Sequence, residues 1–219
     1  MRRALTWLAV LFPLAFLAAP LPGQQVVDRI VAHVEDDIIT LSEVRELGGY
    51  QQLVQGRAES DDRLLAELID QWIVNTEATA ARFPRPMGAE VNRETGRVEK
   101  QFASPEAYHE RLRELGLSVA AVRRLVERQL YLARYLDYKF RPAVQVDSAA
   151  MEKYYREELV PALKARGQAL PALESVQDQI RELLIEREIS QRAARWLDET
   201  RSRIKIEIEP AGKGPERPR

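Results

Sequence analysis

The sequence predicts a mainly α-helical fold in which a small antiparallel β-sheet joins the two ends of the chain. Charged residues make up 31% of the 219 residues and only 10 are glycine, a composition typical of long amphipathic helices. Apolar residues recur at intervals of three and four through most of the chain, which is the helical period. At residues 204–209 apolar and polar residues alternate instead, which predicts a half-buried strand.

Composition also excludes several classes of function. The sequence contains no cysteine, which excludes a disulfide framework, a thiolate metal site and a cysteine nucleophile. Its 33 Lys and Arg residues are balanced by 34 Asp and Glu residues, so no positive surplus favours a nucleic acid. We therefore expect no nucleic-acid partner. A hydrophobic fraction of 45% is sufficient to bury a core.

Residues 1–23 have the pattern of a secretory signal peptide. Two arginines precede an apolar stretch that ends in small residues and prolines. The stretch is interrupted by Pro13 and is short for a bilayer span, which needs about 20 apolar residues. We expect this segment to direct export and to be removed, after which the protein has no stable membrane insertion. An uncleaved N-terminal anchor is the alternative.

The next segment predicts a β-hairpin followed by a capped helix. Residues 27–34 are rich in β-branched side chains and predict a strand, residues 35–37 predict an acidic turn, and residues 38–39 predict a short return strand. Thr40 and Glu43 have the spacing of a capping box, so a helix is expected to begin there.

The middle of the chain predicts a series of helices. Ser60 and the two acids after it predict a helix start, and Phe83-Pro84-Arg85-Pro86 predicts its end. Residues 87–101 predict one or two helical turns and a break at Thr95-Gly96. Ser104-Pro105 starts the next helix, which ends at Gly116, and Ser118 starts a long one that stops at Arg141-Pro142.

The C-terminal third predicts two more helical regions and the last strand. Asp147 or Ser148 caps a helix that Pro161 kinks or restarts, and a long helix runs from about residue 173 to about residue 203. A lone terminal strand is unstable in water, so we expect residues 204–209 to pair with residues 26–40. Residues 24–209 would then form one domain, followed by a disordered tail at residues 210–219.

Four stretches, taken in order, carry a resemblance to a known family. They are VVDRIVAHVEDDIITLSEV, DRLLAELIDQWIVNTEATA, AYHERLRELGLSVAAVRRLVERQLYLARYLDYKF and SVQDQIRELLIEREISQRAARWLDETRSRIKIEI. Together they resemble the SurA family of periplasmic chaperones. In that family a strand, a turn, a short strand and a capped helix come first. A long helix with a tryptophan near its end, here Trp196, precedes a short last strand.

The resemblance implies a multi-helix chaperone module in the periplasm. It implies ATP-independent binding of unfolded or extended polypeptides, with outer-membrane proteins as clients and no cofactor. SurA-type proteins also carry one or two parvulin-type prolyl isomerase domains before the C-terminal helix. Here residues 147–172 occupy that position, and they are too few for such a domain. We therefore expect the chaperone core without isomerase activity. A prolyl isomerase and a dedicated assembly subunit of the cell envelope are the alternatives.

Aromatic and methionine side chains are the candidates for contact with a client, because they offer apolar area with a polar or flexible handle. Most of the large aromatics in helices are expected in the core, namely Trp72, Tyr131, Tyr135, Phe140 and Trp196. The candidates for a client-binding surface are Tyr50, Phe83, Met87, Phe102, Tyr108 and Tyr138.

Two clusters of polar residues raise the alternatives of a metal site and of a catalytic site. His33, Glu35 and Asp37 would lie on one side of a strand and suggest a divalent cation, but an acidic hairpin turn explains them better. The acids of the second helix, Asp61, Asp62, Glu67 and Asp70, are explained by the helix dipole and a solvated face. His109 is expected at the surface. We therefore expect no metal ligand and no catalytic residue.

Overall fold

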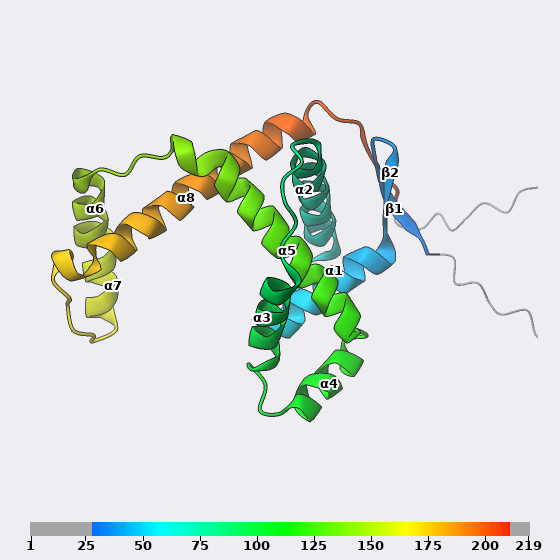
Figure 1. Cartoon of the computed structure of the whole chain (residues 1–219), viewed down its shortest axis with the longest axis horizontal. Coiled ribbons are helices and arrows are strands. Elements are labelled where there is room, and N and C mark those ends of the chain that lie inside the picture. Colours follow the sequence, from blue (N-terminus) through cyan, green and yellow to red (C-terminus); the bar gives the residue numbers. More distant parts are fainter. Residues whose placement is uncertain (1–27, 211–219) are drawn as a thin grey trace, which may run out of the picture.

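The computed structural model describes residues 28–210, so the predicted signal peptide and nearly all of the predicted tail lie outside the described residues. Within that range the protein is mainly helical and carries a small three-stranded antiparallel sheet, which is the predicted fold class. Figure 1 shows the sheet at one end of the molecule and the helices α6 and α7 at the other. The long helix α8 (Leu173–Arg201) connects these two ends.

The sheet joins the two ends of the described chain, as the sequence predicts. β1 (Ile30–Val34) lies between β2 (Asp37–Thr40) and β3 (Ile206–Ile208), and both pairings are antiparallel. Val34 lies opposite Asp37 on one side and Ile206 on the other. The turn is shorter than predicted, because Asp37 already belongs to β2 and Glu35 takes the bend with a φ of 52°.

Helices α1 to α5 follow the predicted order. The capping box is present, since Thr40 and Glu43 each bond the other's backbone N–H. Ser104 and Ser118 also cap their helices through their side chains. Ser60 occupies the N-cap position of its helix, but its side chain makes no capping hydrogen bond. The bounds are α1 Leu41–Gln55, α2 Asp61–Ala80, α3 Gly88–Glu99, α4 Pro105–Glu114 and α5 Val119–Phe140.

The predicted break at Thr95-Gly96 is wrong, because α3 continues through both residues. Thr95 donates its hydroxyl hydrogen to the carbonyl of Val91 within the helix, across 2.8 Å. Val91 and Val98 lie on one face of α3 and are both buried. A glycine inside a helix costs about 1 kcal/mol relative to alanine, and the burial of two valines outweighs that cost.

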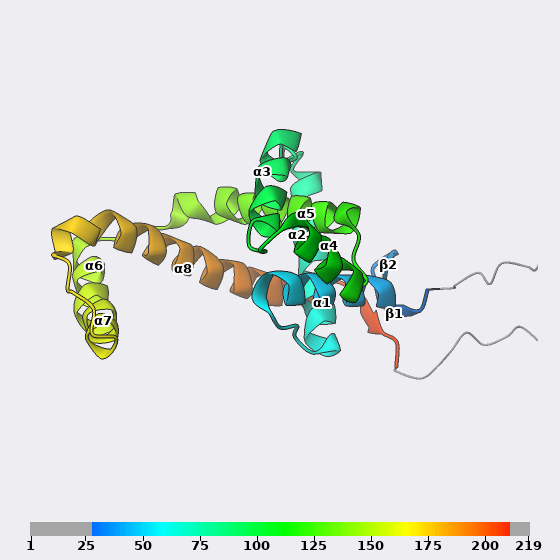
Figure 2. The same ribbon diagram turned by 90° about the horizontal axis from the view of Figure 1, so that it is seen from below.

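The segment after α5 forms a projecting arm. It comprises α6 (Ser148–Tyr154), a π-helical segment (Tyr155–Leu159) and α7 (Val160–Ala165). The sequence predicts that Pro161 kinks or restarts the helix. In the structure a π-helical turn precedes α7, and Pro161 is the second residue of α7. A proline supplies no N–H and crowds the preceding turn, and a wider turn accommodates both effects. Figures 1 and 2 both show the arm away from α1 to α5.

Three groups of buried side chains form the core. The first lies between the sheet, α1 and α2, and half-buried Trp72, Trp196 and Ile206 pack against it. The second joins α1, α3, α4 and α5 around Tyr50 and Tyr108. The third lies between α2 and α5, where Tyr131 and Tyr135 are buried as predicted and Trp196 of α8 packs against them. The C-terminal half of α8 is therefore anchored to the body, while its N-terminal half carries the arm.

Candidate functional site

The six predicted client-binding residues do not form one surface. Tyr50 and Tyr108 are only 4% and 2% exposed, so their assignment to an exposed surface is wrong. Tyr50 donates its hydroxyl hydrogen to Oε1 of Gln129, and burial raises the pKa of both tyrosines. The spacing of these two tyrosines along their helices does indicate that they are buried. Tyr50 lies three residues from buried Leu47, and Tyr108 lies four residues from buried Leu112.

The other four residues lie in separate places. Met87 and Tyr138 are 73% and 64% exposed, whereas Phe83 and Phe102 are half-buried. The ring centroid of Phe83 lies 5.2 Å from that of Tyr138, so these two form a small aromatic surface at the end of the third core group. Phe102 packs on Tyr108 instead, with ring centroids 5.5 Å apart. Among the four residues that are not fully buried, the structure thus brings together only Phe83 and Tyr138.

A crevice of about 600 Å³ lies next to Phe83, between α5 and α8. Its floor contains Leu136 and Ile189, and its rim is charged. Arg141 at the rim bonds Asp137 and Glu182, each at 2.6 Å. These carboxylates raise the pKa of Arg141. The crevice can hold an apolar side chain, but its ion pairs make its entrance polar.

A groove with few polar groups in its lining lies on the arm, where sequence reasoning placed no site. The arm and the first half of α8 enclose a groove of about 520 Å³, here called the arm groove. Its polar lining is limited to Tyr154, Gln168 and Gln179. Leu183 lines it and is still 39% exposed. The apolar wall consists of Leu159, Leu163, Ala169, Pro171, Val176, Ile180 and Leu183.

Polar contacts fix the shape of the arm groove. Arg187 on α8 binds Glu158 of the π-helical segment through two hydrogen bonds of 2.8 and 3.0 Å, and this lowers the pKa of Glu158. The Arg187 guanidinium also lies 5.3 Å from the ring centroid of Tyr154. Tyr155 donates its hydroxyl hydrogen to the carbonyl of Pro171, across 2.6 Å, which holds the loop against the arm. These contacts hold the walls of the groove in place, and the groove can accept apolar side chains.

The acidic hairpin residues make separate structural contacts. Glu35 accepts a hydrogen bond from the backbone N–H of Lys205, and Asp37 accepts one from the indole of Trp72, each across 2.8 Å. Within residues 28–210, no three His, Asp or Glu side chains lie close enough to hold a metal ion. His109 is exposed on α4, as predicted.

The acids of α2 also have structural partners. Asp61 and Asp62 are exposed in the first turn of the helix. Glu67 accepts hydrogen bonds from Nε2 of Gln51 and of Gln71, at 2.8 and 3.0 Å. Burial raises the pKa of Glu67 and, despite its ion pair with an arginine of α8, that of Asp70. These contacts explain the two half-buried carboxylates as parts of the packing between α1, α2 and α8.

No protein-family model matches the chain, and a comparison with curated proteins also gives no match. In the part of the chain that the structure describes, every helix is too short or too polar to cross a membrane.

Proposed function

We propose that this protein binds unfolded or extended polypeptides in the periplasm, without catalysis and without ATP. The observation that carries the proposal is the arm groove, an open apolar groove. The arm that forms it lies away from α1 to α5 (Figures 1 and 2). Concave surfaces lined mainly by apolar side chains are a common form of binding site. Apolar recognition also suits clients of many sequences, because the hydrophobic effect is non-directional.

The fold supports a simple mechanism for this binding. A client segment with exposed apolar side chains would place them in the arm groove, and the crevice beside Phe83 and Tyr138 offers a second contact along α8. Few polar groups line the arm groove, so binding would depend on the apolar area removed from water, at about 25 cal/mol per Å². A client would leave as it folds and buries the same side chains itself.

The resemblance to SurA-type chaperones is the second support, and it suggests outer-membrane proteins as the clients. The two strands, the capped helix, the long last helix and the final strand of this chain occur in the order that the resemblance implies. The arm (residues 148–165) stands at the place in the sequence where the family would have isomerase domains.

Suppression of aggregation tests the proposal. Several unrelated proteins are unfolded chemically and diluted with the purified protein, and light scattering is followed with and without ATP. We expect slower aggregation of all clients and no effect of ATP. Failure with every client would contradict the proposal and favour an assembly subunit with one dedicated partner. Acceleration of proline isomerisation in a peptide assay would contradict the non-catalytic part.

A further inference from the structure

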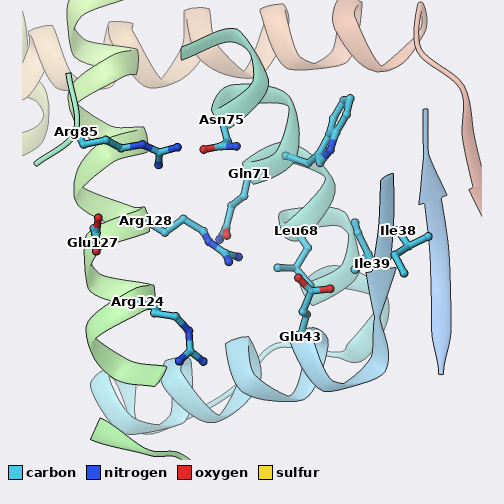
Figure 3. A pocket seen from close by; sticks show the side chains of 11 residues that line it. Ile38, Ile39, Glu43, Leu68, Gln71, Asn75, Arg85, Arg124, Glu127 and Arg128 are labelled. Carbon is cyan, nitrogen blue, oxygen red and sulfur yellow. The ribbon is translucent and has the colours of Figure 1, made fainter. Parts of the chain in front are cut away.

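A third pocket, separate from the arm groove and from the crevice beside Phe83, lies between α2 and α5 beside β2 and has a volume of about 350 Å³ (Figure 3). Its two sides differ in chemistry. Ile39, Leu68 and Trp72 form an apolar wall on the side of β2 and α2. Three arginines reach toward that wall from the opposite side in Figure 3. Arg124 and Arg128 belong to α5, and Arg85 belongs to the loop before α3.

Two of these three arginines have no carboxylate partner among residues 28–210. Arg124 binds Glu46 at 2.9 Å, whereas Arg85 lies over the ring of Tyr131, 4.1 Å from its centroid, and Arg128 forms no ion pair. Two acids also line the pocket, Glu43 and Glu127. Glu43 already accepts a hydrogen bond from the backbone N–H of Thr40, at 2.9 Å, in the capping box. Arg85 and Arg128 are therefore the two positive groups of the pocket that can bind an anionic group, opposite the carboxylates of Glu43 and Glu127.

Gln71 indicates that the ligand also donates a hydrogen bond. Its Nε2 donates to Oε1 of Glu67 at 3.0 Å, and this contact sets the orientation of the amide. Its Oε1 is buried and accepts no hydrogen bond from any described residue. In the view of Figure 3 the end of this side chain overlaps the guanidinium of Arg128. Buried polar groups normally have a partner, so an N–H of a ligand in the pocket would complete this one.

We infer that this pocket binds the C-terminal carboxylate and the apolar last side chain of an extended polypeptide, an inference that rests on the proposed function and names a feature of its clients. Arg85 and Arg128 would hold the carboxylate, and the last peptide N–H would donate to Gln71. The last side chain would lie against Leu68 and Trp72. Capture of a terminal carboxylate is a recurring mode of peptide recognition, and arginine suits it because its fork matches the carboxylate.

The pocket favours a polypeptide terminus over other anions. Inorganic phosphate would leave the apolar wall of Ile39, Leu68 and Trp72 uncovered. A fatty acid would cover that wall but has no N–H for Gln71. The volume, at the small end for ligand pockets, suits a terminal residue better than a long segment.

Fluorescence anisotropy with three probes, labelled at the end away from the carboxyl group or amide, tests the inference. They are a pentapeptide ending in phenylalanine with a free carboxylate, the same peptide with a C-terminal amide, and a labelled fatty acid. We expect saturable binding of the free acid, with the other two about tenfold weaker or more. The amide loses the charged hydrogen bonds to the arginines, and the fatty acid leaves the hydrogen bond to Gln71 unmade.

Arg128→Gln is the key variant, since Arg128 lines the pocket and forms no ion pair with any residue from 28 to 210. It should weaken binding of the free acid about tenfold, and Arg128→Lys, which keeps the charge, should weaken it less. Arg123→Gln is the matched control, because Arg123 is exposed on the same helix and bonds Asn92 instead. Circular dichroism confirms that each variant is folded.

Equal binding of acid and amide, tighter binding of the fatty acid, or unchanged binding by Arg128→Gln would overturn the inference. The aggregation assay separates this failure from that of the proposed function. If the protein suppresses aggregation but does not distinguish acid from amide, the inference alone is wrong. If it binds the free acid through Arg128 but suppresses no aggregation, the general chaperone function is wrong.

Discussion

Arg201, the last residue of α8, donates a hydrogen bond from Nε to Oδ1 of Asp70 on α2 across 2.8 Å, over a sequence separation of 131 residues. Its Nη2 also donates to the carbonyl oxygen of Ala66, at 2.8 Å. β3 pairs with β1 only a few residues further along the chain. The C-terminal end of α8 is therefore attached to the body at two neighbouring points, and the other end of the helix carries the arm outward.

Arg201→Ala should lower the free energy of unfolding by about 1–2 kcal/mol. This value lies between the effects of exposed and of buried ion pairs, because both side chains are about one third exposed. Urea denaturation followed by circular dichroism measures it. Arg203→Ala is the control, since Arg203 is 75% exposed, and it should change the stability by less than about 0.5 kcal/mol. Equal effects of the two substitutions would contradict a role of the Arg201–Asp70 contact.

The raised pKa of Glu67 predicts a specific dependence of stability on pH. Burial raises this pKa above its ordinary value of 4.5, so the folded protein binds the proton more readily than the unfolded chain does. Between the ordinary and the raised value the folded state carries more protons, and the free energy of unfolding therefore falls as the pH rises. Below pH 4.5 this loss of stability is absent, and above the raised pKa of Glu67 it is complete.

The measurement compares Glu67→Gln with the wild type by urea denaturation between about pH 4 and pH 7. The stability of the variant relative to the wild type should rise with pH across this range, because the variant lacks the titrating group. Glu110→Gln, at an exposed position on α4, serves as the control. A relative stability of Glu67→Gln that falls with pH would contradict the assignment.

The serine caps predict a contrast between two similar substitutions. The side chain of Ser118 accepts a hydrogen bond from the backbone N–H of Ala121 at 3.0 Å, whereas that of Ser60 makes no capping bond. Ser118→Ala should therefore lower the free energy of unfolding by about 1 kcal/mol, and Ser60→Ala by less than half of that. Thermal and urea denaturation measure both. A larger loss of stability for Ser60→Ala than for Ser118→Ala would contradict this difference between the two caps.

Much of this fold is encoded in local signals. The β-branched residues before Glu35, the capping box at Thr40 and the alternation at residues 204–209 are each readable within a few positions. The pairing of β3 with β1 also follows from sequence, because a single strand without a partner is unstable. Gly96 shows the limit of local reasoning. Its low helix propensity predicts a break, but valines of the same helix are buried by other elements.

The candidate site was less predictable for the same reason. Tyrosine is a residue type that suits a binding surface, and only the spacing of Tyr50 and Tyr108 from buried leucines indicates that they lie in the core. The arm groove combines side chains from residues 154–171 and 176–183, and neither segment has an apolar surface that is informative alone. The convergence of Arg85 and Arg128 on one pocket likewise depends on how a loop lies against α5. Such contacts are products of tertiary structure.

The most direct test of the central claim is the affinity for an unfolded client when the arm groove is altered. Leu183→Asn removes an apolar side chain from the groove, and Leu183 is exposed enough for the protein to stay folded. Val119→Asn is the control, with a similarly exposed apolar residue at the start of α5. Anisotropy of a labelled, permanently unfolded protein measures the dissociation constant. We predict about tenfold weaker binding for Leu183→Asn and no change for Val119→Asn. Wild-type affinity in Leu183→Asn would contradict the claim that the arm groove binds clients.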